Sequence, residues 1–318
     1  MSGIVALAGG VGGAKLAQGL YRALPPDSLT VLVNTADDFT LHGLRICPDL
    51  DTVLYTLAGL ANAQTGWGIT GDTFSTLDML KRYGAAGTWF QLGDRDFATH
   101  IQRTQGLAAG RPLSAVEADL AAALSVRATL LPMTDAPVAT QVQTAAGLLD
   151  FQEYFVQRHH SDPVQALTFA GIEAATPPSG LAARLAQADA VVFCPSNPLV
   201  SIGPILAVPG LRDLLAAAPG PRVGVSPIVG GQAIRGPAAA MLATLGHEPS
   251  AFGVAQLYAG LLDGLVIDEA DAALAERIAG LGLRVQVAQT VMQDESDRET
   301  LARLVLAFCA ELRGQAAA

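Results

Sequence analysis

The sequence has few cysteines, few charged residues and no long apolar run, and each shortage excludes a class of protein. Its three cysteines are scattered over 318 residues without a Cys-x-x-Cys spacing, which disfavours a zinc site or a redox pair. An uninterrupted stretch of about 20 apolar residues is also lacking, so no membrane-spanning helix is expected. The amino terminus carries glycines in place of the basic start of a signal peptide. We therefore expect a cytoplasmic protein.

Charge is scarce and biased toward acids. Charged residues make up 15% of the chain, and 29 acids against 19 bases give a formal net charge of −10. This balance disfavours binding to nucleic acid or to an anionic membrane, because both need clustered Lys and Arg. Hydrophobic residues account for 51%, which excludes a disordered chain and is enough for a large core.

Both ends of the chain alternate short apolar runs with helical patterns. Strands are expected at 4–8, 29–33, 190–193, 223–225, 265–267 and 284–288, and helices at about 14–24, 270–279 and 295–312. This alternation is typical of a parallel sheet with right-handed crossovers. We predict an α/β fold with a Rossmann-like, doubly wound, mostly parallel sheet.

The middle of the chain has a different pattern. Residues 138–143 and 147–151 alternate like an antiparallel pair of strands, and Ser114 with Glu117 has the spacing of a capping box at a helix start. We therefore expect segment 105–165 to form a mixed α/β insertion or lid. With no Pro- or Ser-rich linker to divide it, the chain is predicted to be a single domain over residues 1–318.

A glycine-rich segment, AGGVGGAK, follows the first expected strand at residues 8–15. Glycines let backbone N–H groups approach an anion, and a helix start with a lysine adds positive charge. The candidate phosphate ligands are Gly10, Gly12, Gly13 and Lys15. The segment is not a dinucleotide fingerprint, because Lys15 stands at the third-glycine position, nor a Walker A loop, because Leu16 follows the lysine. A tight turn that binds nothing is the alternative.

Four carboxylates fall within 15 residues after the second expected strand: Asp37, Asp38, Asp49 and Asp51. Mg²⁺ takes one or two carboxylates together with waters and phosphates, so acids beside a diphosphate loop suit metal-assisted phosphoryl transfer. Helix capping is the alternative for Asp49 and Asp51. A nicotinamide enzyme would instead use Asp37 or Asp38 on a ribose.

Three later motifs carry polar groups that could contact a ligand. In GDRD, Arg95 lies between two acids and can bind a phosphate or a carbonyl, although a structural Arg–Asp network is equally compatible. The loops PSNP and SPIVGG contain Ser196, Asn197 and Ser226, whose hydroxyl and amide groups suit a nucleotide base or ribose. Each of these motifs alone is a weak signal.

The motifs occur together in a characteristic order: LAGGVGGAKL, VNTADD, HGLRICPDLDTVLYTLAG, GWGITGDTF, LGDRDFATHI, LLPMTDAPV, PSNPLVSIGPIL and SPIVGG. In this content and order the chain resembles the 2-phospho-L-lactate transferases of coenzyme F-420 biosynthesis. The resemblance extends from Ile4 to about Asp268. PDLDT, GDRD and SNPxxSIGPI are its most specific parts.

The resemblance implies a Rossmann-like homodimer and a Mg²⁺-dependent transfer. The donor would be a guanosine diphosphate ester of 2-phospholactate or, in bacteria, of phosphoenolpyruvate. The acceptor would be the terminal ribityl hydroxyl of 7,8-didemethyl-8-hydroxy-5-deazariboflavin (Fo), and GMP would be released. Asp37 and Asp51 match family metal ligands, and Asp51 and Arg95 match positions associated with the acceptor. Val11 stands where many members have threonine.

Two other functions remain open. A non-enzymatic UDP-sugar-binding regulator of the gluconeogenesis-factor type would share the glycine loop, but the DLDT and GDRD segments weigh against it. A nicotinamide dehydrogenase is disfavoured by Lys15. The residues do not decide between 2-phospholactate, phosphoenolpyruvate and 3-phosphoglycerate as the transferred acid, and they indicate no general base.

Overall fold

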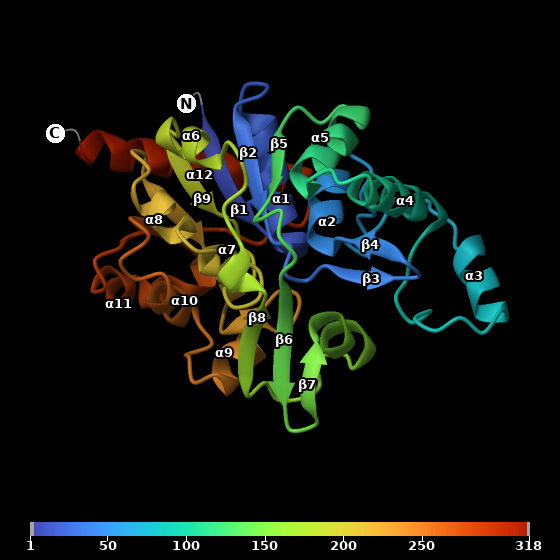
Figure 1. Cartoon of the computed structure of the whole chain (residues 1–318). Helices are drawn as coiled ribbons and strands as arrows, with labels where there is room; N and C mark the ends of the chain where they lie inside the picture. Colours follow the sequence, from blue (N-terminus) through green and yellow to red (C-terminus); the bar gives the residue numbers. More distant parts are fainter. Residues whose placement is uncertain (1–2, 317–318) are drawn as a thin grey trace.

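A parallel β-sheet with helices on both faces forms the centre of the molecule (Figure 1). The structure, a computed structural model, describes residues 3–316. Its main sheet has seven strands in the order β14-β13-β10-β9-β1-β2-β5, and every pairing within it is parallel. The strands are β1 Ile4–Ala8, β2 Leu29–Val33, β5 Thr129–Pro132, β9 Ala190–Phe193, β10 Arg222–Val225, β13 Gly264–Asp268 and β14 Arg284–Ala288. The predicted doubly wound α/β fold is confirmed.

The central strands are apolar along their whole length because both faces of the sheet are covered. Side chains of a strand alternate between the faces. In β1, Ile4, Ala6 and Ala8 pack into one hydrophobic core, whereas Val5 and Leu7 pack into the other. A strand buried on both sides therefore appears in the sequence as an unbroken apolar run.

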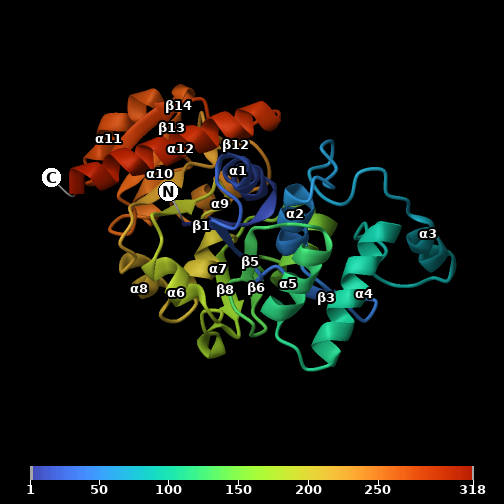
Figure 2. The same ribbon diagram turned by 90° about the horizontal axis from the view of Figure 1, so that it is seen from above.

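The helices divide between these two cores (Figure 2). The first core is covered by α1 Gly10–Ala23, α2 Pro48–Leu57, α5 Leu113–Ala123 and α12 Glu295–Ala316. The second is covered by α6 Leu181–Ala186, α7 Ile202–Ala207, α8 Leu211–Ala216, α9 Ala238–Thr244, α10 Ala251–Leu257 and α11 Ala275–Ala279. Outside the first layer, α4 Asp94–Ala108 packs on α5, and α3 Ser75–Arg82 lies at the periphery (Figure 1).

Three short sheets and three short helical turns complete the part of the chain that the structure describes. The hairpins are β3 Phe39–Leu41 with β4 Leu44–Ile46 and β11 Ile228–Val229 with β12 Gln232–Ala233, and the third sheet joins β6 Ala139–Thr144, β7 Gly147–Asp150 and β8 Ala166–Ala170. The turns are η1 Glu153–Gln157, η2 Ile172–Ala174 and η3 Glu269–Leu274. The antiparallel pair expected at 138–143 and 147–151 is confirmed as β6 and β7.

The bounds of the expected insertion differ from what the structure has. The separate layer begins at β6 and ends at β8, whereas the expectation covered 105–165. Strand β5 belongs to the main sheet, because its apolar residues Leu130 and Leu131 pair with β2. Helix α5 packs against this strand. The run of β5, TLLP, ends in proline, which weakens the strand signal in the sequence, and in the structure β5 is an edge strand.

Two local predictions were wrong. Helix α1 begins at Gly10 and not near residue 14, so the glycines form its first turn. The capping box at Ser114 is absent: α5 begins at Leu113, the Ser114 hydroxyl lies 2.9 Å from Asp135 Oδ2, and Glu117 binds Arg103. A buried guanidinium binds a carboxylate more strongly than an exposed helix start does, which accounts for the change of partner.

The structure also bears on the absences noted in the sequence. No helix within residues 3–316 combines the length and apolarity needed to cross a lipid bilayer. Cys47, Cys194 and Cys309 are all buried and free. Burial raises the pKa of each of these thiols, which keeps them in the unreactive neutral form.

Candidate active site

A cavity of about 410 Å³ opens at the carboxyl edge of the main sheet. Its wall contains residues that directly follow four neighbouring strands: 9–12 after β1, Asp37 after β2, 195–197 after β9 and 226–227 after β10. The chain reverses its direction across the sheet between β1 and β9. Ligands of open α/β sheets bind at such a reversal, so this cavity is the candidate site.

The glycine turn after β1 is held by side chains from other elements. The Gly10 amide donates to Asp49 Oδ1 at 2.8 Å, and the Gly9 amide donates to Ser196 Oγ at 3.0 Å. A Cβ at Gly12 would collide with the Pro195 carbonyl, and one at Gly13 would collide with the Ser196 hydroxyl. These two glycines therefore let α1 pack closely against the loop after β9.

Of the four predicted phosphate ligands, three line the cavity. Gly10, Gly12 and Lys15 lie in its wall, whereas Gly13 lies behind it. Lys15 Nζ donates to the Met292 carbonyl at 2.5 Å. Burial lowers the pKa of Lys15, and the positive charges of Arg298 and Arg235 lower it further. An anion in the cavity would relieve this repulsion and favour the charged lysine.

The first acidic group of the site consists of Asp37 and Asp49, joined by Asn34 at the end of β2. Asn34 Nδ2 donates to Asp49 Oδ2 at 3.0 Å. Burial raises the pKa of Asp37 well above its ordinary value, and the negative charge of Asp49 adds to the effect. Burial also raises the pKa of Asp49 to about 6, against the hydrogen bonds from Asn34 and Gly10.

This group has the properties of a divalent cation site. Asp37 Oδ1 is buried and has no hydrogen-bond partner within the described chain. An unpartnered, desolvated carboxylate oxygen beside a second carboxylate is costly, and a cation bound to both would remove that cost. Both side chains line the cavity, so a cation held there would also reach a bound phosphate.

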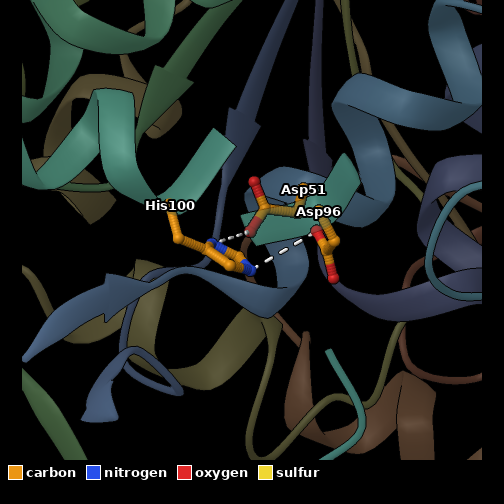
Figure 3. A group of neighbouring side chains, drawn as sticks. All are labelled: Asp51, Asp96 and His100. Carbon is orange, nitrogen blue, oxygen red and sulfur yellow. Dashed lines mark ion pairs between the residues drawn. The ribbon is translucent and has the colours of Figure 1, made fainter. Parts of the chain in front are cut away.

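The second acidic group consists of Asp51 on α2 and Asp96 and His100 on α4 (Figure 3). His100 Nδ1 lies 3.6 Å from Asp51 Oδ2, and its Nε2 lies 3.4 Å from Asp96 Oδ1. Asp96 and His100 are four residues apart, which puts them on one face of the helix. Tyr55 donates its hydroxyl to Asp96 Oδ1 at 2.7 Å. All these side chains line the cavity.

Arg103 balances part of this negative charge from behind the cavity. It is fully buried, and its two terminal nitrogens bind both oxygens of Asp51. Its Nε donates to Glu117 Oε1 at 2.5 Å. Arg103 lies one helical turn after His100 on the same face of α4, and it binds Asp51 and Glu117 without lining the cavity.

The predicted metal ligands Asp37 and Asp51 both line the cavity but have different neighbours. Asp37 is paired with Asp49, whereas Asp51 is neutralised by Arg103. Their joint binding of one ion stays a prediction. Asp49, for which the sequence left helix capping as the alternative, connects the glycine turn to Asn34. In the sequence, Asp49 was identified only as one of the four clustered carboxylates, two positions before Asp51.

Arg95 does not reach the cavity. Its Nη2 binds the Thr70 carbonyl, its Nε lies 3.7 Å from Asp72 Oδ1, and about half of its side chain is exposed. It therefore anchors the loop between α2 and α3. Asp96 accepts the Tyr55 hydroxyl, and Gly93 precedes the helix.

The three predicted loop residues line the cavity with polar groups that are already engaged. Ser196 Oγ accepts from Gly9, Asn197 Oδ1 accepts from the Leu199 amide at 2.9 Å, and Ser226 Oγ donates to the Ile228 carbonyl at 2.9 Å. These bonds shape the loops after β9 and β10. Direct contact of the three side chains with a nucleotide stays a prediction.

The cavity wall also includes residues that were not among the predicted site residues. They share apolar or aromatic character, and lie far apart along the chain: Ile46, Trp67, Phe90, Phe151, Phe155 and Ile234. Only the fold brings them together. The cavity therefore offers carboxylates, a lysine and aromatic surfaces at once, which suits a ligand pair with phosphates and a flat ring.

The sequence of the chain matches a known protein family. The family model of 2-phospho-L-lactate transferase CofD matches residues 4–307. The chain belongs to this family. A phosphoenolpyruvate transferase from Streptomyces griseus subsp. griseus is 47% identical over 315 residues, which cover 98% of this chain and 99% of the relative. A 2-phospho-L-lactate transferase from Methanosarcina acetivorans is 38% identical over 303 residues, covering 95% and 98%.

A solved structure supports the fold alone. A UPF0052-family protein from Bacillus halodurans has a TM-score of 0.65 and 14% identity, and the alignment covers 96% of this chain and 99% of that one. At such identity the likeness does not extend to ligands.

Membership in the 2-phospho-L-lactate transferase family favours a transferase over the two alternative functions considered above.

Stability should fall as pH rises, because burial raises the pKa of Asp37, of Asp49 to about 6 and of Asp38 to about 7. The folded protein holds these protons at pH values where the unfolded chain has released them. The resulting stabilisation is fully present below about pH 4 and is lost as pH rises through 6 to 7. The loss is on the order of a few kcal/mol.

A Mg²⁺ ion bound to the ionised carboxylates would reverse this loss. Differential scanning fluorimetry is expected to show a clear Mg²⁺-dependent rise in Tm at about pH 8 and little rise at about pH 5, where protons compete. In the Asp37→Asn, Asp49→Asn double variant the rise should disappear. A Mg²⁺ effect of equal size at both pH values would contradict the assignment of these carboxylates.

Proposed function

We propose that this protein transfers a phospho-acid, 2-phospholactate or phosphoenolpyruvate, from its guanosine diphosphate ester to the ribityl hydroxyl of Fo, releasing GMP. The reaction would be a step of coenzyme F-420 biosynthesis. The observation that carries the proposal is one cavity with an anion-binding turn, buried carboxylates and aromatic walls, in a chain of this family. The relatives' names supply the two candidate acids.

The donor diphosphate is assigned to the amino-terminal end of α1. The first-turn amides of this 14-residue helix and the partial positive charge of its terminus attract phosphate. Lys15 adds a full charge on the same cavity wall. Because Val11 has no hydroxyl, the turn contributes only backbone donors at that position.

A Mg²⁺ ion is assigned to Asp37 and Asp49, where the unpartnered oxygen fits a cation. When bound there, Mg²⁺ would neutralise charge on the diphosphate and make its phosphorus more electrophilic. The chain's own contribution is to fix the carboxylates: Asn34 and the Gly10 amide hold Asp49 in one orientation. Asp51, held by Arg103, is assigned to the acceptor side, which its match to the family's acceptor position also supports.

In the reaction, the ribityl oxygen forms a bond to the phosphorus that carries the acid, and the bond from that phosphorus to the GMP oxygen breaks. GMP leaves as a stable phosphate and needs little protonation. Catalysis is then mainly alignment and charge neutralisation by the cavity residues. The hydroxyl proton is released, and no single residue is assigned as its acceptor.

The test is a transfer assay with mass-spectrometric detection. Purified protein, Mg²⁺ and Fo are incubated with the guanosine diphosphate esters of 2-phospholactate, phosphoenolpyruvate and 3-phosphoglycerate in competition. A product with the mass of Fo plus the phospho-acid is expected, with an equal amount of GMP. We expect phosphoenolpyruvate to be preferred, because the more similar of the two relatives described above is a phosphoenolpyruvate transferase. Folded protein that makes no product from any donor would contradict the proposal.

Two predictions about the setting of the enzyme accompany this proposal. A homodimer is expected from the family resemblance, and sedimentation would test it. A cytoplasmic location is expected as well, and the buried free thiols of the three cysteines are compatible with a reducing compartment.

A further inference from the structure

Two segments from opposite halves of the chain meet at the cavity. One is the loop 61–72 between α2 and α3, and the other is the segment 228–238, which contains β11 and β12 and leads into α9. We call these two segments the cover. They are joined by Arg235, whose Nη1 donates to the Thr65 carbonyl at 2.5 Å across 170 residues of sequence. Both segments contribute residues to the cavity wall.

The loop of the cover is anchored at its base and held lightly at its tip. At the base, Ala61 pairs with Ile69, and Arg95 binds the Thr70 carbonyl. In the described chain, the hydrogen bonds of residues 63–67 stay within the loop, apart from the one that Arg235 makes. A single bond to an exposed carbonyl opens at little cost.

The cover carries large apolar side chains that are not yet buried. Trp67 is 44% exposed and Ile234 is 56% exposed, although both line the cavity. One belongs to each segment of the cover. A ligand with a flat ring would give both side chains a surface to pack on, which favours a more closed cover when the cavity is occupied.

Arg235 also faces the anion-binding end of the cavity. Its charge lowers the pKa of Lys15, so the two cations repel one another across the cavity. Within residues 3–316 its guanidinium makes no salt bridge, and its hydrogen bond goes to a neutral carbonyl. An anion between Lys15 and Arg235 would turn this repulsion into attraction on both sides.

The contact between the cover and the glycine turn is close. Gly66, with φ +81°, lies under the Arg235 guanidinium and beside Val11: a Cβ there would lie 2.6 Å from Arg235 Nη1 and 2.9 Å from Val11 Cγ1. The tip of the loop therefore rests on the turn assigned to the donor diphosphate. A ligand bound at the turn would therefore affect the position of the cover.

We propose that Arg235 is the latch of this two-part cover, and that an anionic group bound between Lys15 and Arg235 closes it over the cavity. Arg235 would contact the bound anion directly and connect it to the loop that carries Trp67. The inference rests on the proposed function for the identity of the anion, a nucleoside diphosphate or its ester.

The test uses Trp67 as a fluorescent reporter. The chain has two tryptophans, so Trp89→Phe leaves Trp67 as the only one. Acrylamide quenching of Trp67 is measured with and without GDP and Mg²⁺, and calorimetry measures GDP and Fo binding in parallel. GDP is expected to lower the quenching constant about twofold. Arg235→Gln should weaken GDP binding about tenfold and, at saturating GDP, leave the quenching constant at its unliganded value.

Two glycine variants provide a matched pair. Gly66→Ala and Gly68→Ala introduce the same methyl group at positive φ, +81° and +71°, in the same loop. The first meets Arg235 and Val11, whereas a Cβ at Gly68 has nothing within 4 Å. GDP should protect Trp67 in Gly68→Ala and fail to do so in Gly66→Ala, because only the latter disturbs the latch.

The possible outcomes distinguish failure of the latch from failure of the proposed function. If calorimetry shows GDP binding while Trp67 quenching is unchanged, or falls equally in Arg235→Gln, the latch is overturned and the proposed function stands. If neither GDP nor Fo binds the unmodified protein, the proposed function is contradicted and the latch, which needs such a ligand, falls with it.

Discussion

The Asp37→Asn variant is expected to lose at least about three orders of magnitude of transferase activity. Asparagine keeps the shape of the side chain but removes the negative charge next to Asp49. The Asp37 carboxylate, whose unpartnered oxygen fits a cation, would become a neutral amide group. The measurement is the initial rate of Fo-product formation at saturating Mg²⁺, together with a circular dichroism spectrum that shows intact folding.

The neighbouring residue supplies the control. Asp38 is as buried as Asp37 and its Oδ1 also has no hydrogen-bond partner within the described chain, but its Oδ2 accepts from Arg45 Nη2 at 3.2 Å and it is not part of the cavity wall. Asp38→Asn should therefore keep most of the activity. An Asp37→Asn enzyme within about tenfold of the unmodified rate would remove Asp37 from the reaction.

The largest effect on stability is expected from Arg103→Met, which should lower the free energy of unfolding by about 3–5 kcal/mol. Arg103 is fully buried between Asp51 and Glu117, and its loss would leave two carboxylates in the interior without their counter-ion. Methionine fills a similar volume, so the effect would come from the missing charge and hydrogen bonds. Urea denaturation at neutral pH measures it.

An exposed ion pair gives the comparison. Arg303 binds Glu299 at 2.6 Å one turn earlier on α12, but the Arg303 side chain is 63% exposed to water and the Glu299 side chain 36%. Arg303→Met should cost less than about 1 kcal/mol, because solvent already screens the pair. If Arg103→Met cost no more than Arg303→Met, the buried network would not be a stabilising element of α4 and α5.

The main sheet could be predicted because its information is local. The first two strands occupy residues 4–8 and 29–33, as expected, since the first is an unbroken apolar run before a glycine and the second is apolar except for Thr30 and precedes an asparagine. Burial on both faces requires such a run, and the turn residues mark where it ends.

The contacts of the site could not be predicted, because they join residues that are distant in sequence. Glu117 has the spacing of a capping residue, but in the core it accepts a hydrogen bond from Arg103. Asp49 also fits a helix cap by local pattern, while its partners Gly10 and Asn34 lie on two other elements. A local pattern identifies the residue type, and the tertiary partner decides its use.

The GDRD motif shows the same limit on a single helix. Arg95 and Asp96 are adjacent, so α4 turns them in different directions. Asp96 shares a face with His100 and lines the cavity, whereas Arg95 points to Thr70 and Asp72. The sequence prediction named Arg95 as the site residue of this motif, whereas Asp96 is the residue that lines the cavity.

A crystal structure with Mn²⁺, GDP and Fo bound would test the central claim most directly, because the anomalous signal of manganese locates the ion without ambiguity. We expect Mn²⁺ on the carboxylates of Asp37 and Asp49, the GDP phosphates beside Lys15, and the deazaflavin within the same cavity. An ion bound elsewhere with Asp37 and Asp49 turned away from it, or nucleotide and deazaflavin outside this cavity, would contradict the account.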